Sequence, residues 1–215
     1  MLNEKAKIAN LHYLYADLPE EKAHKKASRR LSKFGYELDK KNTDKDVLTA
    51  KRGDNVHINY SGTNIRNPRD IISDVALGVG VQRLNPQFKE RRQKTRNIMR
   101  QYGDDNSYSL GGHSLGGSIA LNTVGQSKSI RDRVKKVDVF NPGYTLPFHN
   151  SIKVDKPIKR ELNEKVNIHR TKGDIVSAHA NKETAFGNLF EYKHKDKNAD
   201  LSDKHALDTF INSDL

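Results

Sequence analysis

The chain has 215 residues, a length that suits one domain with its own hydrophobic core. Leu, Ile, Val and Phe supply only 50 of these residues, so we expect a lean core under a very polar surface. The absence of cysteine excludes disulfide bonds, thiolate metal sites and a cysteine nucleophile. The formal net charge of +12 indicates either an anionic partner or simply a lysine-rich, solvated surface.

The first part of the chain, residues 1–35, predicts two helices that form an N-terminal extension. Apolar residues recur at helical spacing between Leu11 and Leu18, which predicts a helix with one apolar edge. A second helix is expected to begin near Pro19 and to stop at Gly35, because proline favours the first turn of a helix and glycine favours its end.

After this extension, a predicted hairpin gives way to strands that alternate with helices. The alternation predicts an α/β fold with a mostly parallel central sheet and helices on both faces. The lysine-rich stretches 153–165 and 193–197 are expected to be solvated loops. The predicted strands are 36–39, 47–51, 56–62, 107–112, 135–142, 165–170 and 186–193, and the predicted helices are 67–80, 85–103, 114–126 and 201–212.

The clearest chemical signal is a glycine-rich motif between a predicted strand and a predicted helix. Gly112, Ser114 and Gly116 form the pattern Gly-x-Ser-x-Gly, which places a serine on a sharp strand-to-helix elbow. Such a turn brings the residues two before and two after the serine so close together that only glycine fits. We therefore predict Ser114 as a nucleophile and the N–H of Leu115, at the helix N-terminus, as a donor to the oxyanion.

With this elbow, the chain resembles the class 3 (fungal-type) lipases of the α/β-hydrolase fold. The resemblance covers roughly residues 45–215 and implies a single α/β-hydrolase domain over 1–215. It also implies that Thr63 supplies its N–H and hydroxyl to the oxyanion. The chain departs from the family at Ser61, where members commonly have arginine, so any ion pair of that arginine is missing or replaced. The matching segments are VHINYSGTN at 56–64, GHSLGG at 112–117 and VDVFNPG at 137–143.

A serine nucleophile needs a base, and the base needs an acid to orient it. In this fold the chain order is serine, then Asp or Glu, then histidine. His205 resembles the family's C-terminal histidine, which precedes an apolar residue and an aromatic one. Asp174 matches the family's strand–loop–Asp-x-Val segment and follows the end of a predicted strand, where α/β folds place functional groups. The alternatives are His149, His169, His179 and His194 for the base and Asp138, Asp155 and Asp203 for the acid.

The other histidines have simpler interpretations. His113 precedes the nucleophile and is expected to point away from it as a structural residue. His57 alternates with apolar residues and is expected to be packed or on the surface, and His12 is expected to be a surface residue. No His, Asp or Glu grouping has metal-ligand spacing and no phosphate-binding loop is present, so we expect neither a metal nor a cofactor.

Two neighbouring stretches bear on how the protein would meet its substrate. Residues 76–88 are apolar, interrupted by glycine and expected to be poorly helical, and in lipases this region often carries a lid. Residues 83–100 contain seven Lys and Arg and only one acidic residue, Glu90. Two interpretations stay open: docking on an anionic phospholipid surface, or an ordinary sheet-covering helix with a solvated basic face.

These observations predict a serine carboxylic-ester hydrolase that acts on lipid esters through an acyl-enzyme, as a lipase or phospholipase. The positive charge favours phospholipid over triglyceride. The alternatives are another serine hydrolase, a thioesterase or peptidase, and a non-catalytic basic module that binds nucleic acid or protein. Nucleic acid is disfavoured because neither an RNA-binding aromatic motif nor zinc-finger spacing is present. Without a signal peptide or transmembrane stretch, we expect a soluble protein, intracellular or virion-associated, and predict no oligomeric state.

Overall fold

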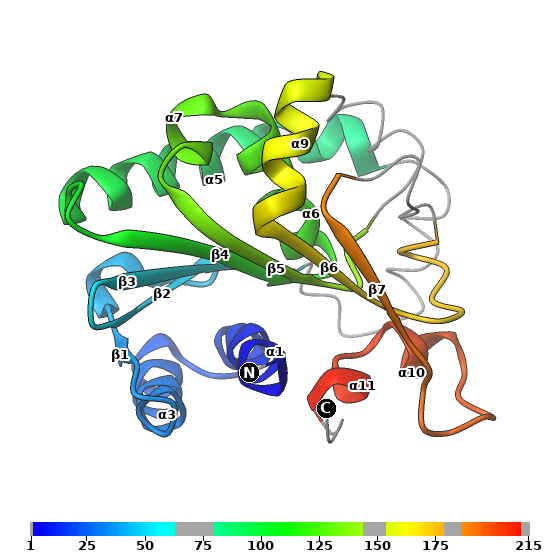
Figure 1. Ribbon diagram of the computed structural model, residues 1–215. Coiled ribbons are helices and arrows are strands. Elements are labelled where there is room, and N and C mark those ends of the chain that lie inside the picture. Colours follow the sequence, from blue (N-terminus) through cyan, green and yellow to red (C-terminus); the bar gives the residue numbers. More distant parts are fainter. Residues whose placement is uncertain (1, 63–79, 144–153, 179–185, 212–215) are drawn as a thin grey trace.

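The computed structural model describes residues 2–62, 80–143, 154–178 and 186–211, with the backbone alone for residues 80–85. Within these ranges, seven strands form one sheet in the order β1-β2-β3-β4-β5-β6-β7 (Figure 1). The pairs from β1 to β3 are antiparallel and those from β3 to β7 are parallel, which confirms the mostly parallel sheet. The strands are β1 (Glu37–Leu38), β2 (Val47–Arg52), β3 (Asn55–Tyr60), β4 (Ser107–His113), β5 (Val134–Phe140), β6 (Val166–Thr171) and β7 (Asn188–Tyr192).

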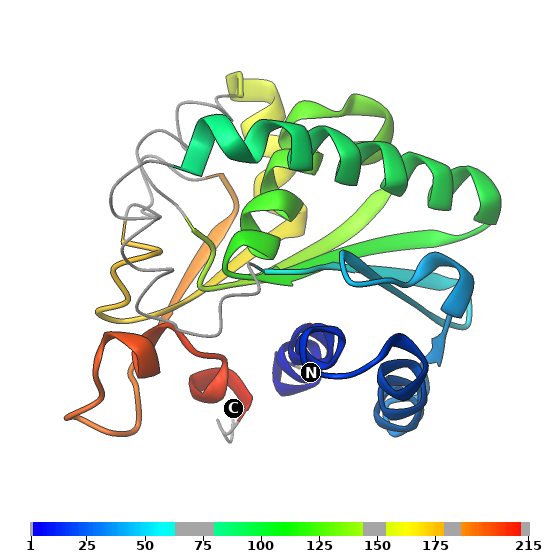
Figure 2. The ribbon, with the colours of Figure 1, turned by 180° about the vertical axis from the view of Figure 1, so that it is seen from behind.

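Helices cover both faces of this sheet, as Figures 1 and 2 show. One face carries α5, α6, α7 and α9, and the other carries α1, α3 and α11. No helix in the described ranges is both long and apolar enough to cross a bilayer. The helices are α1 (Leu2–Asn10), η1 (Leu11–Tyr13), α2 (Leu14–Asp17), α3 (Glu20–Ser32), η2 (Lys40–Asn42), α5 (Gly80–Tyr102), α6 (Leu115–Gln126), α7 (Lys128–Arg131), α9 (Lys156–Lys165), α10 (Leu201–His205) and α11 (Asp208–Ile211).

The main hydrophobic core lies between the sheet and the α5–α9 layer. Because side chains alternate along a strand, Val56 and Ile58 of β3 enter this core. The neighbouring His57 and Asn59 are also buried, on the opposite face, where His57 Nδ1 lies 2.9 Å from Ser109 Oγ of β4. The sheet therefore has one apolar face and one face with a buried polar row, and helix α1 packs against the latter.

One predicted loop is a helix. Residues 153–165 contain α9, which has Pro157 in its first turn, so the expectation of a solvated loop is wrong. Leu162 is fully buried and Ile158, four residues before it, packs against the main core. Two apolar side chains one turn apart are enough to dock a helix whose other positions are charged, and the lysine-rich composition concealed this pair.

The structure also differs from the sequence-based elements at three other places. Residues 80–84, expected to be poorly helical, belong to α5, which begins five residues before the predicted helix 85–103 and has Pro86 inside it. Tertiary context overrides helix propensity here, which is only a weak guide. The predicted first helix is interrupted by η1, and the predicted C-terminal helix is divided at Ala206, whose backbone is extended. Residues 67–79, which hold most of another predicted helix and part of the predicted lid, lie outside the described residues.

Candidate active site

The turn between β4 and α6 has the geometry of a nucleophile elbow. Ser114 has a φ of 53°, in the region that non-glycine residues rarely adopt, and it is buried. A Cβ on Gly112 would lie 2.4 Å from the carbonyl carbon of Gly116, and one on Gly116 would lie 2.2 Å from the carbonyl oxygen of Tyr60. The two glycines are therefore required by the close approach of three backbone segments, as the sequence motif predicts.

Three residues that are far apart in the sequence meet at this elbow. The Ser114 hydroxyl lies 2.8 Å from His205 Nε2, and Nδ1 of the same ring lies 3.1 Å from Asp174 Oδ1. Ser114 comes from the β4–α6 turn, Asp174 follows β6, and His205 ends α10. The imidazole can therefore accept the serine proton on one nitrogen while its other nitrogen donates to the carboxylate.

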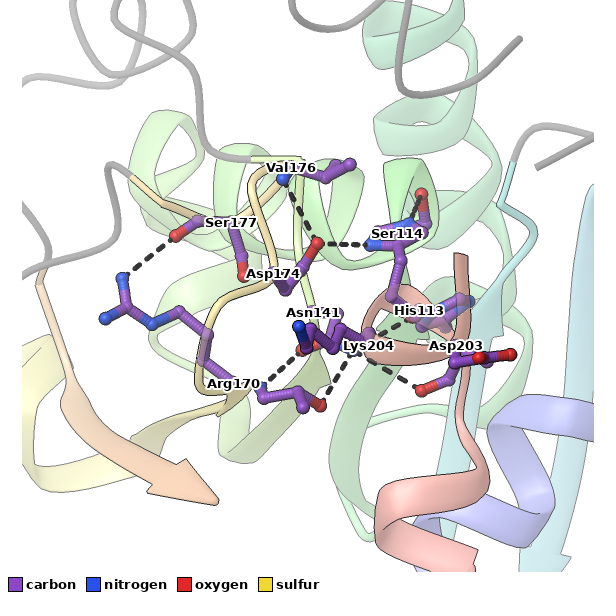
Figure 3. Close-up of polar contacts among 12 residues, drawn as sticks. His113, Ser114, Asn141, Arg170, Asp174, Val176, Ser177, Asp203 and Lys204 are labelled. Atoms are coloured by element: carbon purple, nitrogen blue, oxygen red, sulfur yellow. Dashed lines mark hydrogen bonds and ion pairs between the residues drawn. The ribbon is translucent and has the colours of Figure 1, made fainter. Parts of the chain in front are cut away.

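The Asp174 carboxylate is held by two further donors. Its Oδ1 accepts a hydrogen bond from the Val176 N–H at 3.1 Å, and its Oδ2 accepts one from the Ser177 hydroxyl at 2.5 Å. Figure 3 shows Val176 and Ser177 around this carboxylate, with Ser114 close by. The Asp174 side chain is fully buried, so these bonds and the imidazole N–H compensate its charge in place of water.

Asn141, which the sequence analysis missed, holds the backbone that carries His205. It is fully buried, has a φ of 40° and directly follows β5. Its amide Nδ2 donates to the carbonyl oxygens of Lys204 at 3.0 Å and His205 at 2.9 Å, while its Oδ1 accepts from the Thr171 N–H at 2.7 Å. One side chain therefore joins the ends of β5, β6 and α10 (Figure 3). An Asn-Pro-Gly turn was visible in the sequence, but nothing in it pointed to His205.

His113 connects the site to the N-terminal helices. Its Nε2 donates to the His205 carbonyl oxygen at 2.7 Å, and its Nδ1 accepts the Tyr13 hydroxyl proton at 2.5 Å. Burial lowers the pKa of His113 to about 3, so the ring is neutral and both bonds persist at ordinary pH. The ring bonds to Tyr13 and to the backbone of His205 rather than to the serine hydroxyl, consistent with the structural role expected for it.

The structure describes one of the two predicted oxyanion donors, Leu115. Leu115 is the first residue of α6, where a backbone N–H has no acceptor within the helix. Thr63 lies outside the described residues. The residue before it, Gly62, lies against the elbow, since a Cβ there would be 3.7 Å from Ser114 Cβ. Ser61, at the family's arginine position, donates its hydroxyl to the Gly62 carbonyl oxygen at 2.9 Å.

The described alternative residues have other partners. His169 Nε2 lies 3.4 Å from Asp138 Oδ1 on the polar face of the sheet, and His194 Nδ1 accepts from the Asp196 N–H. Asp155 is the N-cap residue of α9, and Asp203 belongs to the capping box of α10. His149 and His179 lie outside the described residues. Within the described ranges, no group of three His, Asp or Glu side chains could hold a metal ion.

The expectation for His12 is wrong, because this residue is not on the surface. Only 3% of it is exposed, and its Nε2 donates to the Lys45 carbonyl oxygen at 2.6 Å. His12 belongs to η1, and its ring lies 5.7 Å from the Tyr15 ring, centroid to centroid. His57, which the sequence predicts to be packed or on the surface, is buried.

Solved structures share this architecture, two lipases among them. A lipase from Rhizopus microsporus var. chinensis superposes with a TM-score of 0.50 at 16% identity, over 93% of this chain and 75% of that one. Lipase II from Rhizopus niveus gives a TM-score of 0.52 at 13% identity, over 91% of this chain and 80% of that one. The chain has the fold of these two Rhizopus lipases. No family model and no curated protein matches the sequence.

Within this lipase fold, the elbow stands where β4, a central strand of the sheet, ends. β3, β5 and β6 run parallel to β4, so their carboxyl ends meet at the same edge. Gly62, Asn141 and Asp174 follow those three strands, which explains how residues from separate segments converge on Ser114. The strand order thus brings Ser114 and Asp174 to one edge of the sheet, and His205 reaches them from α10.

Proposed function

We propose that this protein is a serine carboxylic-ester hydrolase. The observation that carries the proposal is the hydrogen-bonded series from Ser114 Oγ through the His205 ring to Asp174, located at the elbow of a lipase fold. The same series of groups performs acyl transfer on several unrelated folds, because an aligned base and acid make a neutral hydroxyl nucleophilic.

In the proposed reaction, Ser114 Oγ attacks the ester carbonyl carbon while its proton passes to His205 Nε2. The carbonyl oxygen becomes an oxyanion that accepts from the Leu115 N–H and, by resemblance to the family, from Thr63. The imidazolium, stabilised by Asp174, then protonates the leaving alcohol as the carbon–oxygen bond breaks. Water attacks the acyl-enzyme with His205 as its base, which releases the acid and restores the serine.

The substrate class we propose is a lipid ester. The likeness to two Rhizopus lipases supports this class, although at 13–16% identity the likeness itself concerns the fold. The basic side chains of α5 give less support to docking on an anionic membrane. Arg91 pairs with Asp46 at 2.6 Å and Lys94 bonds to Asp44, so both are engaged within the molecule. These partners favour a sheet-covering helix over a membrane-docking one.

The test is hydrolysis of p-nitrophenyl esters with short and long acyl chains by the wild type and by Ser114→Ala. Removing the nucleophile should lower kcat/KM by about 10³-fold or more. Ser129→Ala, an exposed serine of α7 outside the site, is the matched control and should retain the wild-type rate. Equal rates in wild type and Ser114→Ala would refute the proposal.

The wild type and Ser114→Ala also distinguish an esterase from a thioesterase or a peptidase. A thioester and a peptide anilide with the same acyl group are compared with the oxygen ester. We expect the oxygen ester to have the highest kcat/KM, and a strong preference for the thioester or anilide would assign the site to a different reaction. Anionic and zwitterionic vesicles test the basic helix, and equal rates on both are expected from its internal ion pairs.

A further inference from the structure

The bend before β2 holds the segment that leads to the proposed oxyanion donors. Ser61 and Gly62 follow β3 directly, and Thr63, the donor that the family resemblance implies, comes next in the sequence. The Ser61 N–H donates to the Asp46 carbonyl oxygen at 3.1 Å, which extends the pairing of β2 with β3 by one residue. The backbone at Asp46 therefore fixes the place where this segment leaves the sheet.

The same segment packs closely against the elbow. A Cβ on Gly116, in the first turn of α6, would lie 2.8 Å from the carbonyl carbon of Ser61. Likewise, a Cβ on Gly62 would lie 3.0 Å from the His113 carbonyl oxygen. Because Leu115, the other proposed donor, begins α6, a shift of Ser61 changes the spacing of the groups that would receive the oxyanion.

Helix α5 holds this bend through two ion pairs. Arg91 lies 2.6 Å from Asp46 Oδ1, with 13% of the Arg91 side chain and 30% of the Asp46 side chain exposed. Lys94, on the next turn, bonds to Asp44 Oδ2. Oδ1 of Asp44 in turn accepts from the Asp46 N–H at 2.8 Å. An ion pair that water reaches only in part is screened less than an exposed one, so the pair of Arg91 with Asp46 is suited to fix the bend.

We infer that Arg91 is a positioning residue for the proposed reaction. Through Asp46, it sets the place of Ser61 against α6 and thereby the spacing of the oxyanion donors. Such donors act when they lie about 2.7–3.1 Å from the position that the oxyanion takes, so a small displacement lowers the rate while the ester itself binds as before. This inference rests on the proposed hydrolase function.

The experiment compares two esters that differ only at the carbonyl group. One is the p-nitrophenyl ester that the wild type hydrolyses fastest, and the other is its thiono analogue, with sulfur in place of the carbonyl oxygen. Sulfur is the larger atom and the weaker hydrogen-bond acceptor, so donors placed for an oxyanion favour the oxygen ester. The ratio of the two kcat/KM values therefore reports the placement of the donors. Because it compares two substrates on one protein, partial loss of folded enzyme leaves this ratio unchanged.

The ratio is measured in the wild type, Arg91→Met, Asp46→Ala and the double variant. Each single variant should lower it about 10-fold, with a lower kcat and a KM close to the wild-type value for the oxygen ester. Because the two side chains act through one ion pair, the double variant should lower the ratio no further than either single variant. The matched control is Glu161→Ala, which breaks a pair at 3.0 Å with Arg131, between α9 and α7. The Glu161 side chain is 36% exposed, similar to that of Asp46, and this control should keep the wild-type ratio.

The outcomes separate the positioning role from the hydrolase function. A wild-type ratio in both single variants, or losses that add in the double variant, overturns the positioning role while hydrolysis that depends on Ser114 stands. An equal loss in Glu161→Ala also overturns it, because the loss would then follow from the removal of any ion pair. If the wild type hydrolyses no oxygen ester, or Ser114→Ala hydrolyses it at the wild-type rate, the hydrolase function fails and this inference fails with it.

Discussion

Asn141 shows how a residue without a chemical role can control the site. It occupies a backbone conformation that glycine tolerates best, and its side chain fixes the carbonyl groups of Lys204 and His205. The His205 ring must lie within hydrogen-bond distance of Ser114 Oγ and Asp174 at once. Small displacements of such groups lower rates sharply, so the amide of Asn141 acts as a positioning group.

Replacing this side chain should therefore lower activity and stability by separable amounts. In both Asn141→Ala and Asn141→Gly the amide is lost, and we expect kcat for ester hydrolysis to fall by about 10- to 100-fold. The alanine variant should also lose about 1 kcal/mol more unfolding free energy than the glycine variant, because only glycine adopts the positive φ without strain. Urea unfolding and steady-state kinetics measure both effects. A glycine variant with wild-type kcat would contradict the positioning role.

The sequence predicted which residues meet at the elbow far better than which residues hold them there. Ser114, Asp174 and His205 belong to motifs whose residue types the proposed reaction requires, and the structure brings the three side chains together. Asn141 and Tyr13 act through contacts with distant residues. Such contacts depend on how the segments pack, and no local pattern encodes them.

At the scale of elements, the N-terminal helices are part of the site's support rather than a separate attachment. Tyr13, in η1, bonds to His113 in β4, and His113 bonds to the backbone of His205 at the end of α10. Helix α1 also packs against α11, where the Asn3 amide donates to the Ile211 carbonyl oxygen at 2.6 Å. Three segments distant in sequence thus stabilise one another on the polar face of the sheet.

This connection predicts an effect of Tyr13→Phe on catalysis. The variant leaves His113 Nδ1 buried without a donor, so the unfolding free energy should fall by about 1–3 kcal/mol. We expect kcat to fall as well, since His113 holds the carbonyl oxygen of His205. Denaturant unfolding and kinetics are compared with Tyr36→Phe, which loses a hydroxyl remote from this series. Unchanged kcat in Tyr13→Phe would show that the N-terminal helices do not influence the site.

The order and type of most elements could be predicted from the sequence, but helix α9 and the break at η1 could not. The elbow strand and helix were predictable because a motif and hydrophobic periodicity agree there. Helix α9 was not predictable, since its docking depends on the single pair Ile158 and Leu162 among charged residues. The break at η1 was not predictable because the apolar spacing of the sequence continues across it while the backbone changes.

At the scale of the whole molecule, buried neutral histidines link stability to pH. His12, His57 and His113 are buried, and burial is the main cause that lowers the pKa of each below its ordinary value of 6.5. Below about pH 6.5 the unfolded chain binds protons at these rings that the folded protein does not. Their contribution to stability is therefore complete above pH 6.5 and is lost as the pH falls toward 4. The pKa values of Asp44 and Asp138 are also lowered in the folded protein, so protonation of these carboxylates at lower pH reduces the unfolding free energy further.

We therefore expect the unfolding free energy to fall steadily between pH 7 and pH 4.5. One ring contributes a slope of about 1.4 kcal/mol per pH unit well below pH 6.5, so His57→Leu should reduce the measured slope by about that amount. Ser109, which loses a partner in this variant, keeps its bond to Asn55 at 3.1 Å. Denaturant titrations at several pH values give the slope. A slope identical to that of the wild type would show that His57 titrates alike in both states.

The strained conformation of Ser114 has a consequence for how this chain can change over time. Its φ of 53° would suit a glycine, and strain of this kind costs of order 1–3 kcal/mol. Folding alone therefore gives no reason to keep a serine side chain there. A chain that no longer needed the hydroxyl could replace Ser114 with glycine and lose the strain. Under the proposed function, the hydroxyl at this turn serves the reaction at a cost in stability.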